Sequence, residues 1–157
     1  MIDEISLNIL SILQEKARIP NVEVARQVGM APSAVLERIR KLEKQGFIDG
    51  YEVRLNPGRF NKSLVAFISV KTGDNSDEAA FVKTLSAIPE IQEIHYVAGN
   101  DGYLLKIRVS NTDSLGRFIR TKIATIGSVL STKTTIVMNT FKETARIPID
   151  EKDLTQQ

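Results

Sequence analysis

Four basic side chains fall within seven residues of the sequence, at Arg38, Arg40, Lys41 and Lys44. Clustered cations bind phosphate groups, and on a helix that enters a groove of DNA they hold the duplex in place. The alternative is an ordinary solvated helix face, because most charge runs on helices are no more than that. The elements around the cluster have to decide between these two interpretations.

The composition argues against other kinds of chemistry. The chain has 157 residues, no cysteine and one histidine, so disulfides and thiol chemistry are excluded and no zinc-ligand spacing is found. It shows no carboxylate pair with a histidine, no nucleophile motif and no phosphate loop, so we expect no enzyme activity, no metal and no cofactor. Neither a membrane-spanning run nor a signal-peptide pattern is present, and we expect a cytoplasmic protein.

The periodicity predicts three short helices before residue 50. Asp3 caps the first, which ends before Pro20 and has an apolar face formed by Ile5, Ile9, Ile12 and Leu13. Asn21 can cap a second helix that ends at Gly29. A third helix begins at Pro32 and has an inner stripe formed by Val35, Leu36, Ile39 and Leu42. This arrangement is typical of a helix-turn-helix, whose last helix enters the major groove of DNA.

The outward face of the third predicted helix supplies the candidate DNA-binding residues, which are Ser33, Ala34, Glu37, Arg38, Lys41 and Lys44. The inferred helix faces favour Ser33, Arg38 and Lys41 for contact with DNA, and Arg40 less. Residues 1–62 carry a net charge of +2, whereas residues 63–157 are balanced. Ala31 stands at the N-cap and supplies no side-chain oxygen, so we expect Ser33 or a DNA phosphate to satisfy the free amides. A small helical bundle without a role in DNA binding stays open as the alternative.

The rest of the chain predicts strands at 63–72, 91–98, 103–109 and 129–141, with helices that begin at Ser76 or Asp77 and at Asn111 or Thr112. The order β-α-β-β-α-β is that of the ferredoxin-like fold. Two helices on one face leave the other sheet face uncovered, so we expect a second copy to cover it in a homodimer. Residues 145–157 are predicted to be a mobile tail.

The segment Gly99-Asn100-Asp101-Gly102 lies between the second and third predicted strands. These residue types tolerate positive φ angles, so the segment predicts the turn of a β-hairpin. From the residues alone, the further question of whether this turn binds a small molecule stays open. The single histidine, His95, lies on the strand before the turn, and we expect it to be packed or hydrogen-bonded rather than catalytic.

The stretch from Asn21 to Pro57 reads N-V-E-V-A-R-Q-V-G-M-A-P-S-A-V-L-E-R-I-R-K-L-E-K-Q-G-F-I-D-G-Y-E-V-R-L-N-P. It resembles the DNA-binding half of the Lrp/AsnC family of leucine-responsive, or feast/famine, transcription regulators, and the resemblance continues to about residue 142. It implies an α+β protein with a winged helix-turn-helix at 1–50, a β-strand linker at 51–62 and a ferredoxin-like effector-binding (RAM) domain at 63–142, followed by a tail at 143–157. It also implies homodimers that assemble into octamers.

The resemblance gives the predicted hairpin a second role. In many family members this hairpin carries a G-D-x-D pattern and helps to form the pocket for an amino-acid effector at the contact between dimers. Carried over, the effector-binding residues would be Gly99, Asn100, Asp101, Gly102 and Tyr103, with Thr132 and Thr134 as weaker candidates. Asn100 and Gly102 stand where acidic residues are usual, so an altered effector, or none, stays open.

The sequence therefore predicts a transcriptional regulator that binds specific double-stranded DNA and is modulated by an amino acid or a related small molecule. The alternative is an effector-independent architectural protein that wraps DNA with little sequence preference. The ratio of affinities for specific and random DNA distinguishes the two.

Overall fold

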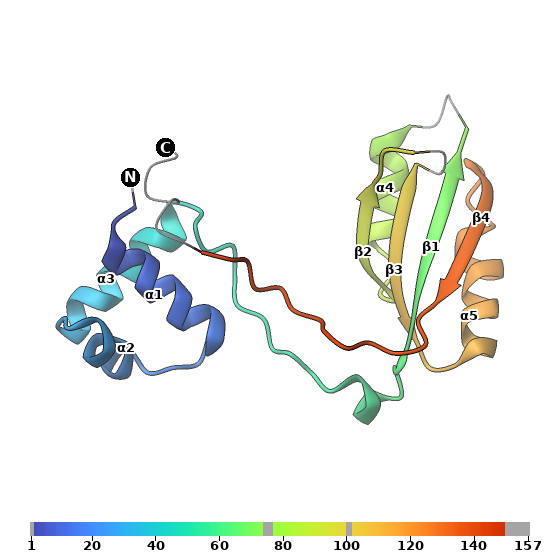
Figure 1. The fold of residues 1–157 in the computed structure, drawn as a ribbon. Coiled ribbons are helices and arrows are strands. Elements are labelled where there is room, and N and C mark those ends of the chain that lie inside the picture. Colours follow the sequence, from blue (N-terminus) through green and yellow to red (C-terminus); the bar gives the residue numbers. More distant parts are fainter. Residues whose placement is uncertain (1, 74–76, 100–101, 150–157) are drawn as a thin grey trace. The chain divides into compact units, whose positions relative to one another are not determined.

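The computed structural model describes residues 2–73, 77–99 and 102–149. The chain forms two compact units (Figure 1). The first unit consists of Met1–Arg54 together with Lys142–Gln157, and the second consists of Leu55–Phe141. The chain therefore passes from the first unit to the second and then returns. Asn100 and Asp101, two of the predicted effector residues, lie outside the described residues.

The first unit contains the three predicted helices, α1 (Glu4–Glu15), α2 (Asn21–Val28) and α3 (Pro32–Lys44). Apolar residues that recur every three or four positions form one shared core, in which Ile9, Val24 and Val35 are fully buried. Gly29 ends α2 with a φ angle of 69°, a left-handed conformation that glycine adopts without steric cost. The tight turn between α2 and α3 is the turn of a helix-turn-helix.

Two details of the first unit differ from the predictions. Asn21 is the first residue of α2 and does not cap it, because Pro20 stands at the N-cap position in an extended conformation. In the described part of this unit, the structure has helices and no strands, and residues 51–56 after them have no regular structure. Asp3 caps α1 as predicted, since its side chain accepts a hydrogen bond from the Ser6 amide.

The second unit has the predicted β-α-β-β-α-β order. Its elements are β1 (Leu64–Thr72), α4 (Glu78–Ser86), β2 (Ile91–Tyr96), β3 (Tyr103–Val109), α5 (Thr112–Phe118), the π-helical turn η2 (Ile119–Ile123) and β4 (Val129–Ile136). The four strands pair antiparallel in the order β2-β3-β1-β4. This is the ferredoxin-like arrangement. A 3-10 turn, η1 (Pro57–Phe60), precedes the sheet.

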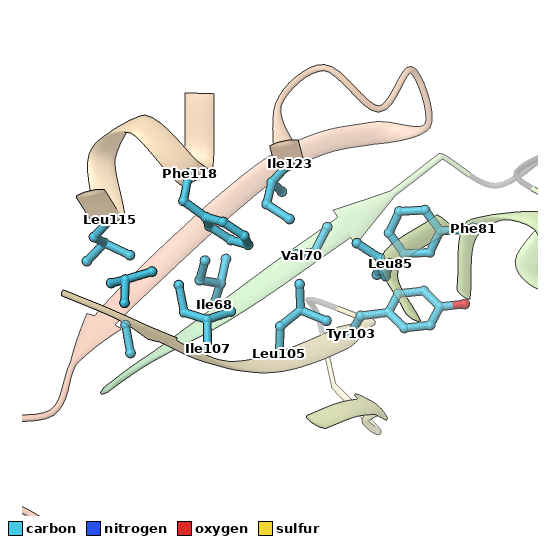
Figure 2. Packing of buried hydrophobic residues seen from close by; sticks show 12 residues of the cluster. Ile68, Val70, Phe81, Leu85, Tyr103, Leu105, Ile107, Leu115, Phe118 and Ile123 are labelled. Atoms are coloured by element: carbon cyan, nitrogen blue, oxygen red, sulfur yellow. The ribbon is translucent and has the colours of Figure 1, made fainter. Parts of the chain in front are cut away.

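The core of the second unit lies between the sheet and its two helices (Figure 2). Buried and half-buried residues alternate along β3, as expected for a strand with one covered face. The covered face contributes Ile68, Val70, Leu105 and Ile107, and the helices contribute residues such as Leu85 and Phe118. Both helices therefore cover the same face of the sheet, and the opposite face has no covering layer in the described part of this unit.

Two predicted strands are shorter or absent in the structure. Residues 51–56, predicted as a linker strand, have no regular structure, although Tyr51, Val53 and Leu55 alternate with polar residues and are exposed. The last strand ends at Ile136 and not at Phe141. An alternating pattern creates a strand only where a neighbouring strand supplies hydrogen bonds. Residues 51–56 have no such neighbour in the described part of the chain, whereas Val137, just after β4, still donates a 2.9 Å hydrogen bond from its amide to the Val65 carbonyl of β1.

Candidate functional site

The outer face of α3 is formed by polar side chains on the side opposite the core. Val35, Ile39 and Leu42 are buried and define the inner side of the helix. Because successive residues turn by about 100°, the most outward positions are those half a turn from this stripe. They are occupied by Ser33, Glu37, Arg40, Lys41 and Lys44, all of them exposed. We refer to these five residues as the α3 outer face, and three of them are cations.

The structure separates the predicted DNA-binding residues into two groups. Ser33, Glu37, Lys41 and Lys44 lie on the α3 outer face as predicted, whereas Ala34 and Arg38 are half-buried at its edge. The predicted preference for Arg38 over Arg40 in contact with DNA stays a prediction, and the structure shows Arg40 exposed and Arg38 half-buried beside the core stripe. Sequence periodicity places Arg38 only one step from the inner side of the helix, and this position was the available signal.

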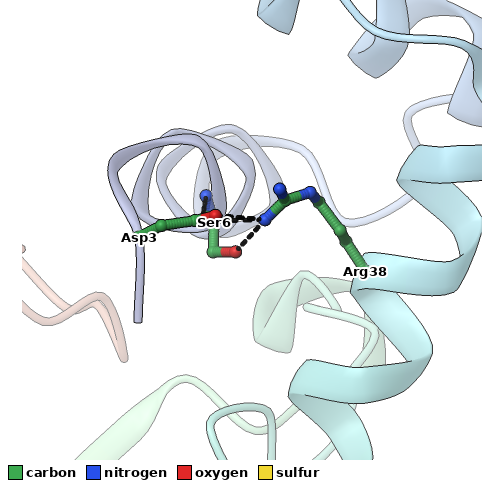
Figure 3. A network of polar contacts seen from close by, with 3 residues as sticks. All are labelled: Asp3, Ser6 and Arg38. Atoms are coloured by element: carbon green, nitrogen blue, oxygen red, sulfur yellow. Dashed lines mark hydrogen bonds and ion pairs between the residues drawn. The ribbon is translucent and has the colours of Figure 1, made fainter. Parts of the chain in front are cut away.

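Arg38 is bound to the first turn of α1 (Figure 3). Its Nη1 atom donates hydrogen bonds to both carboxylate oxygens of Asp3, at 2.8 and 2.6 Å, and to Oγ of Ser6 at 3.0 Å. The hydrogen bonds from Ser6 and Arg38 lower the pKa of Asp3 from 3.8 to about 2. The predicted DNA contact is therefore engaged in an intramolecular ion pair.

The helix-turn-helix differs from the other helices in its N-terminal caps. The side chains of Asp3, Asp77 and Asn111 cap α1, α4 and α5, but no side chain caps α2 or α3. The expectation that Ser33 satisfies the first amides of α3 finds no support in the hydrogen bonds of that helix. Unpaired amides at a helix N-terminus attract anions such as phosphate, which fits a helix that approaches DNA.

A further cation of the helix-turn-helix lies on α2. Arg26 is largely exposed, and its guanidinium donates to both carboxylate oxygens of Glu23, at 3.0 and 2.6 Å. This pairing, with a further hydrogen bond from Gln27, lowers the pKa of Glu23 to about 2. The positive charge of Arg26 is therefore balanced within α2.

The predicted hairpin turn joins β2 to β3. The Val97 amide donates a hydrogen bond of 2.7 Å to the Gly102 carbonyl and closes the hairpin. Gly102 has a φ angle of 81°, and a Cβ atom at this position would lie 3.6 Å from the Val70 carbonyl oxygen. Gly99 also has a positive φ angle, of 145°. Both glycines are thus required by the conformation of the turn.

Strand pairing brings part of the predicted effector site together. Tyr103 pairs with Tyr96 on β2 and with Val70 on β1, and Val70 pairs with Thr132 on β4. These four residues form one row across the sheet, on its helix-covered side. Since neighbouring strands are about 4.8 Å apart, Tyr103 and Thr132 stand about 10 Å from each other. Thr134 belongs to the next row, opposite Ile68.

The side chain of Tyr103 is not available as a surface contact, because it is 5% exposed. Its ring packs edge-on against Phe81 at a centroid distance of 5.0 Å (Figure 2). Burial, followed by the negative charge of Glu78, raises the pKa of Tyr103. The ring of Tyr96 packs edge-on against that of Tyr103 at a centroid distance of 5.3 Å, is 74% exposed and is not among the residues predicted from the sequence. Its position in the sequence, near the end of the predicted strand and just before the predicted turn, is the signal that could identify it.

The sheet face opposite the helices carries a mixed surface. Phe67 and Leu104 are half-buried on it, and the register pairs Phe67 with Lys106. Glu93 forms an ion pair with Lys106, in which Oε1 lies 2.8 Å from Nζ. Its other carboxylate oxygen, Oε2, lies 3.1 Å from Nε2 of His95. His95 is therefore a hydrogen-bonded strand residue, as predicted. An apolar centre surrounded by paired charges is suited to contact with another protein surface.

No helix in residues 2–73, 77–99 and 102–149 combines the length and the apolar character needed to cross a membrane.

Comparison with known proteins gives the same two-part division. Residues 2–49 match a winged helix-turn-helix DNA-binding domain, and residues 65–147 match the Lrp/AsnC ligand binding domain. The leucine-responsive regulatory proteins of Klebsiella pneumoniae and Escherichia coli K12 are each 37% identical to this chain over 150 residues. In both cases the match covers 94% of this chain and 92% of the relative.

Solved structures agree with this result. A transcriptional regulator from Neisseria meningitidis in complex with L-methionine matches with a TM-score of 0.90 and 28% identity, over 94% of this chain and 97% of that one. Escherichia coli AsnC matches with a TM-score of 0.85 and 26% identity, over 94% and 99% of the two chains. Both architecture and sequence thus point to the same family.

Proposed function

This chain belongs to the Lrp/AsnC family and is a DNA-binding transcriptional regulator with a ligand-binding domain, and we propose that it reads specific DNA sequences with the α3 outer face. The observation that carries this proposal is the exposure of Arg40, Lys41 and Lys44 on one side of the second helix of a helix-turn-helix. Lysine and arginine at such positions bind phosphates, while Ser33 and Glu37 have side chains that can hydrogen-bond to base edges.

The finer part of the proposal concerns the effector. We propose that an amino acid or a related small molecule binds at the end of the sheet formed by the β2–β3 hairpin, with Gly99, Asn100, Asp101 and Gly102 at the turn. The row from Tyr96 through Tyr103 to Thr132 supports this location, because it adds an exposed aromatic ring and a hydroxyl at the same end. Tyr103 is buried at the base of the hairpin. Thr134 lies in the next row of the sheet, further from the turn than Thr132.

The names of similar proteins support this class of ligand. One group of relatives is called leucine-responsive, and one similar structure contains L-methionine. An amino acid offers an ammonium group that needs an acceptor and a carboxylate that needs amides or a cation. Glycine-rich turns expose amides, and Asp101 is the acidic residue of this turn. Asn100 and Gly102 stand where acidic residues are usual in the family, so Asp101 is the carboxylate that this turn offers to the ammonium group.

For assembly and location, we propose a homodimer that forms through the uncovered sheet face, further association into an octamer, and a cytoplasmic protein. Phe67 and Leu104 support the dimer, because half-buried apolar side chains on an open sheet gain stability when a second sheet covers them. An effector could then change DNA binding by binding one arrangement of subunits more tightly than another. The ligand-binding domain and the regulators among the relatives favour this function over an effector-independent architectural role.

The experiment that tests the effector proposal is a thermal-shift screen of the purified protein against the twenty amino acids. A ligand that binds only the folded protein raises the melting temperature by mass action. We expect one amino acid to raise it and the rise to disappear in Asp101→Ala. No shift at millimolar concentrations of any of the twenty would contradict the proposal, and turnover of an amino acid would instead indicate an enzyme.

A further inference from the structure

Arg38 differs from the cations of the α3 outer face in the direction of its side chain. It is 30% exposed and lies between the core stripe and the outer face. Figure 3 shows its guanidinium extending from α3 toward the first turn of α1, where Asp3 and Ser6 receive it. Arg40, Lys41 and Lys44 are on the exposed side of the same helix.

The carboxylate of Asp3 both caps α1 and binds Arg38. Oδ1 of Asp3 accepts the Ser6 amide at 2.9 Å, which caps α1, and also accepts Nη1 of Arg38 at 2.8 Å. Oδ2 accepts the same nitrogen at 2.6 Å. The end of α1 is thus fixed to the middle of α3 by charge-assisted hydrogen bonds, which are more directional than apolar contacts.

A cavity of about 50 Å³ lies between α1 and α3 and is lined by Ile2, Asp3, Ser6, Arg38, Lys41, Leu42 and Gln45. Polar side chains form most of this lining, so the contact between the two helices is polar at this point. Within this lining, the Arg38 side chain reaches from α3 to Asp3 and Ser6 at the start of α1.

We propose that Arg38 is a positioning residue for DNA recognition, which orients α3 through Asp3 and Ser6 and leaves the DNA contacts to the α3 outer face. This inference rests on the proposed role of the α3 outer face. In this proposal, removing Arg38 lowers DNA affinity indirectly, because the neighbouring residues of α3 are then misplaced. A misplaced recognition helix loses specific contacts while the phosphate contacts of its exposed cations remain.

The test compares Asp3→Ser with Arg38→Ala, with Arg40→Ala as the matched removal of an outer-face arginine. Serine is as good an N-cap as aspartate, so Asp3→Ser removes the ion pair and retains the cap of α1. The DNA probes are a duplex that the full-length wild-type protein selects from a random library and a scrambled duplex of equal length. Affinities are measured at several salt concentrations. The temperature of the measurement is kept well below the melting temperature of each variant.

We expect Asp3→Ser and Arg38→Ala each to weaken binding to the selected duplex by about tenfold, the effect expected when a misplaced helix loses a base contact. The salt dependence should stay that of the wild type, because both variants still neutralise the same phosphates. The double variant should bind no more weakly than the single ones, since both changes break the same pair. Arg40→Ala should reduce the salt dependence instead.

The proposal is overturned if Asp3→Ser binds the selected duplex as tightly as the wild type or more tightly. If Arg38 contacted DNA, removing a carboxylate beside it would leave binding unchanged or strengthen it, and Arg38→Ala would lower the salt dependence. Wild-type affinity in both variants would equally overturn it, because the pair would then serve stability alone. If Arg38→Ala does not fold, Asp3→Ser still decides the question. An unchanged Arg40→Ala would contradict the proposed outer face and leave the comparison of Asp3 with Arg38 intact.

Discussion

The side chain of Gln14 makes a two-point contact with the backbone of Ile147, 133 residues later in the chain. Its Nε2 donates to the Ile147 carbonyl at 3.1 Å, and its Oε1 accepts from the Ile147 amide at 2.9 Å. Arg146 also donates to the carbonyl of Glu15 at 3.3 Å, and Ile149 packs against the core of the first unit. The described residues of the predicted tail therefore bind α1. The two units are joined by two segments of chain, one before β1 and one after β4.

Replacing Gln14 with alanine should release this returning segment. The removal of both hydrogen bonds is expected to lower the free energy of unfolding of the first unit by about 1 kcal/mol, because the contact is exposed to solvent. Hydrogen exchange measured at the Ile147 amide should become faster, while exchange in β3 stays unchanged. Gln27→Ala is the matched control, since Gln27 also donates a side-chain hydrogen bond on an exposed helix. Unchanged exchange at Ile147 in Gln14→Ala would contradict the contact.

The α3 outer face predicts a defined decrease in salt dependence. Arg40→Ala combined with Lys44→Ala should weaken DNA binding and reduce the slope of log K against log salt by about 1 for each phosphate that the protein no longer neutralises. Lys83→Ala, which removes a charge from the last turn of α4, is the control and should keep the wild-type slope. Equal slopes for all three proteins, measured by titration at several salt concentrations, would show that DNA binds another surface.

The Asp3 carboxylate predicts a pH dependence of stability. Its pKa falls from 3.8 to about 2 on folding, so it stabilises the folded state above about pH 4. This contribution is lost as the pH falls through the folded-state pKa near 2, because the unfolded chain then binds the proton more readily. Unfolding of wild type and Asp3→Ser between pH 5 and pH 2 should therefore show a smaller decline in the variant. Parallel curves would mean that Asp3 has an ordinary pKa in the folded protein.

The uncovered sheet face predicts the oligomeric state. Phe67→Glu places a charge at the centre of this face, where burial against a second sheet would be costly. We expect light scattering coupled to size-exclusion chromatography to report dimers or larger assemblies for the wild type and a smaller species for Phe67→Glu. Lys83→Glu, on α4, should assemble normally. A wild-type monomer, or a Phe67→Glu assembly of unchanged mass, would contradict a dimer formed through this face.

Tyr96 gives a test of the effector site that lies outside the turn itself. Its ring is 74% exposed, so Tyr96→Ala should leave the ligand-free melting temperature nearly unchanged. The shift that an amino acid produces should become smaller, because the ring flanks the hairpin at the proposed site. Phe60→Ala removes another exposed aromatic residue, 58% exposed and located before the sheet, and serves as the control. An identical ligand-induced shift in Tyr96→Ala would exclude Tyr96 from the site.

Local pattern was sufficient to predict much of the fold. Strand β3 has the predicted bounds, Tyr103–Val109, because strict alternation of covered and open positions leaves little freedom in register. Gly29 and Pro32 likewise fix the end of α2 and the start of α3 through conformations that these residues prefer. The preference of asparagine for cap positions predicts Asn21 as the cap of α2, but the extended backbone of Pro20 takes that position and moves the boundary by one residue.

The structure differs from the predictions where contacts with residues distant in sequence determine the surroundings of a side chain or the formation of a strand. Arg38 carries the same charge as Arg40, and only the packing of α1 on α3 brings Asp3 within its reach. Similarly, Val53 lies in an alternating segment, but a strand needs a neighbouring strand, which the described part of the chain does not supply. The row that joins Tyr103 to Thr132 depends on the pairing of β1 with both β3 and β4. Sequence periodicity contains none of these long-range choices.

The most direct test of the whole interpretation is the ratio of affinities for selected and scrambled duplexes of equal length, measured with the wild-type protein at one physiological salt concentration. A sequence-specific regulator should bind the selected duplex at least about a thousandfold more tightly. A ratio near one would contradict sequence-specific reading by α3 and would instead indicate an architectural protein that holds DNA through its phosphates.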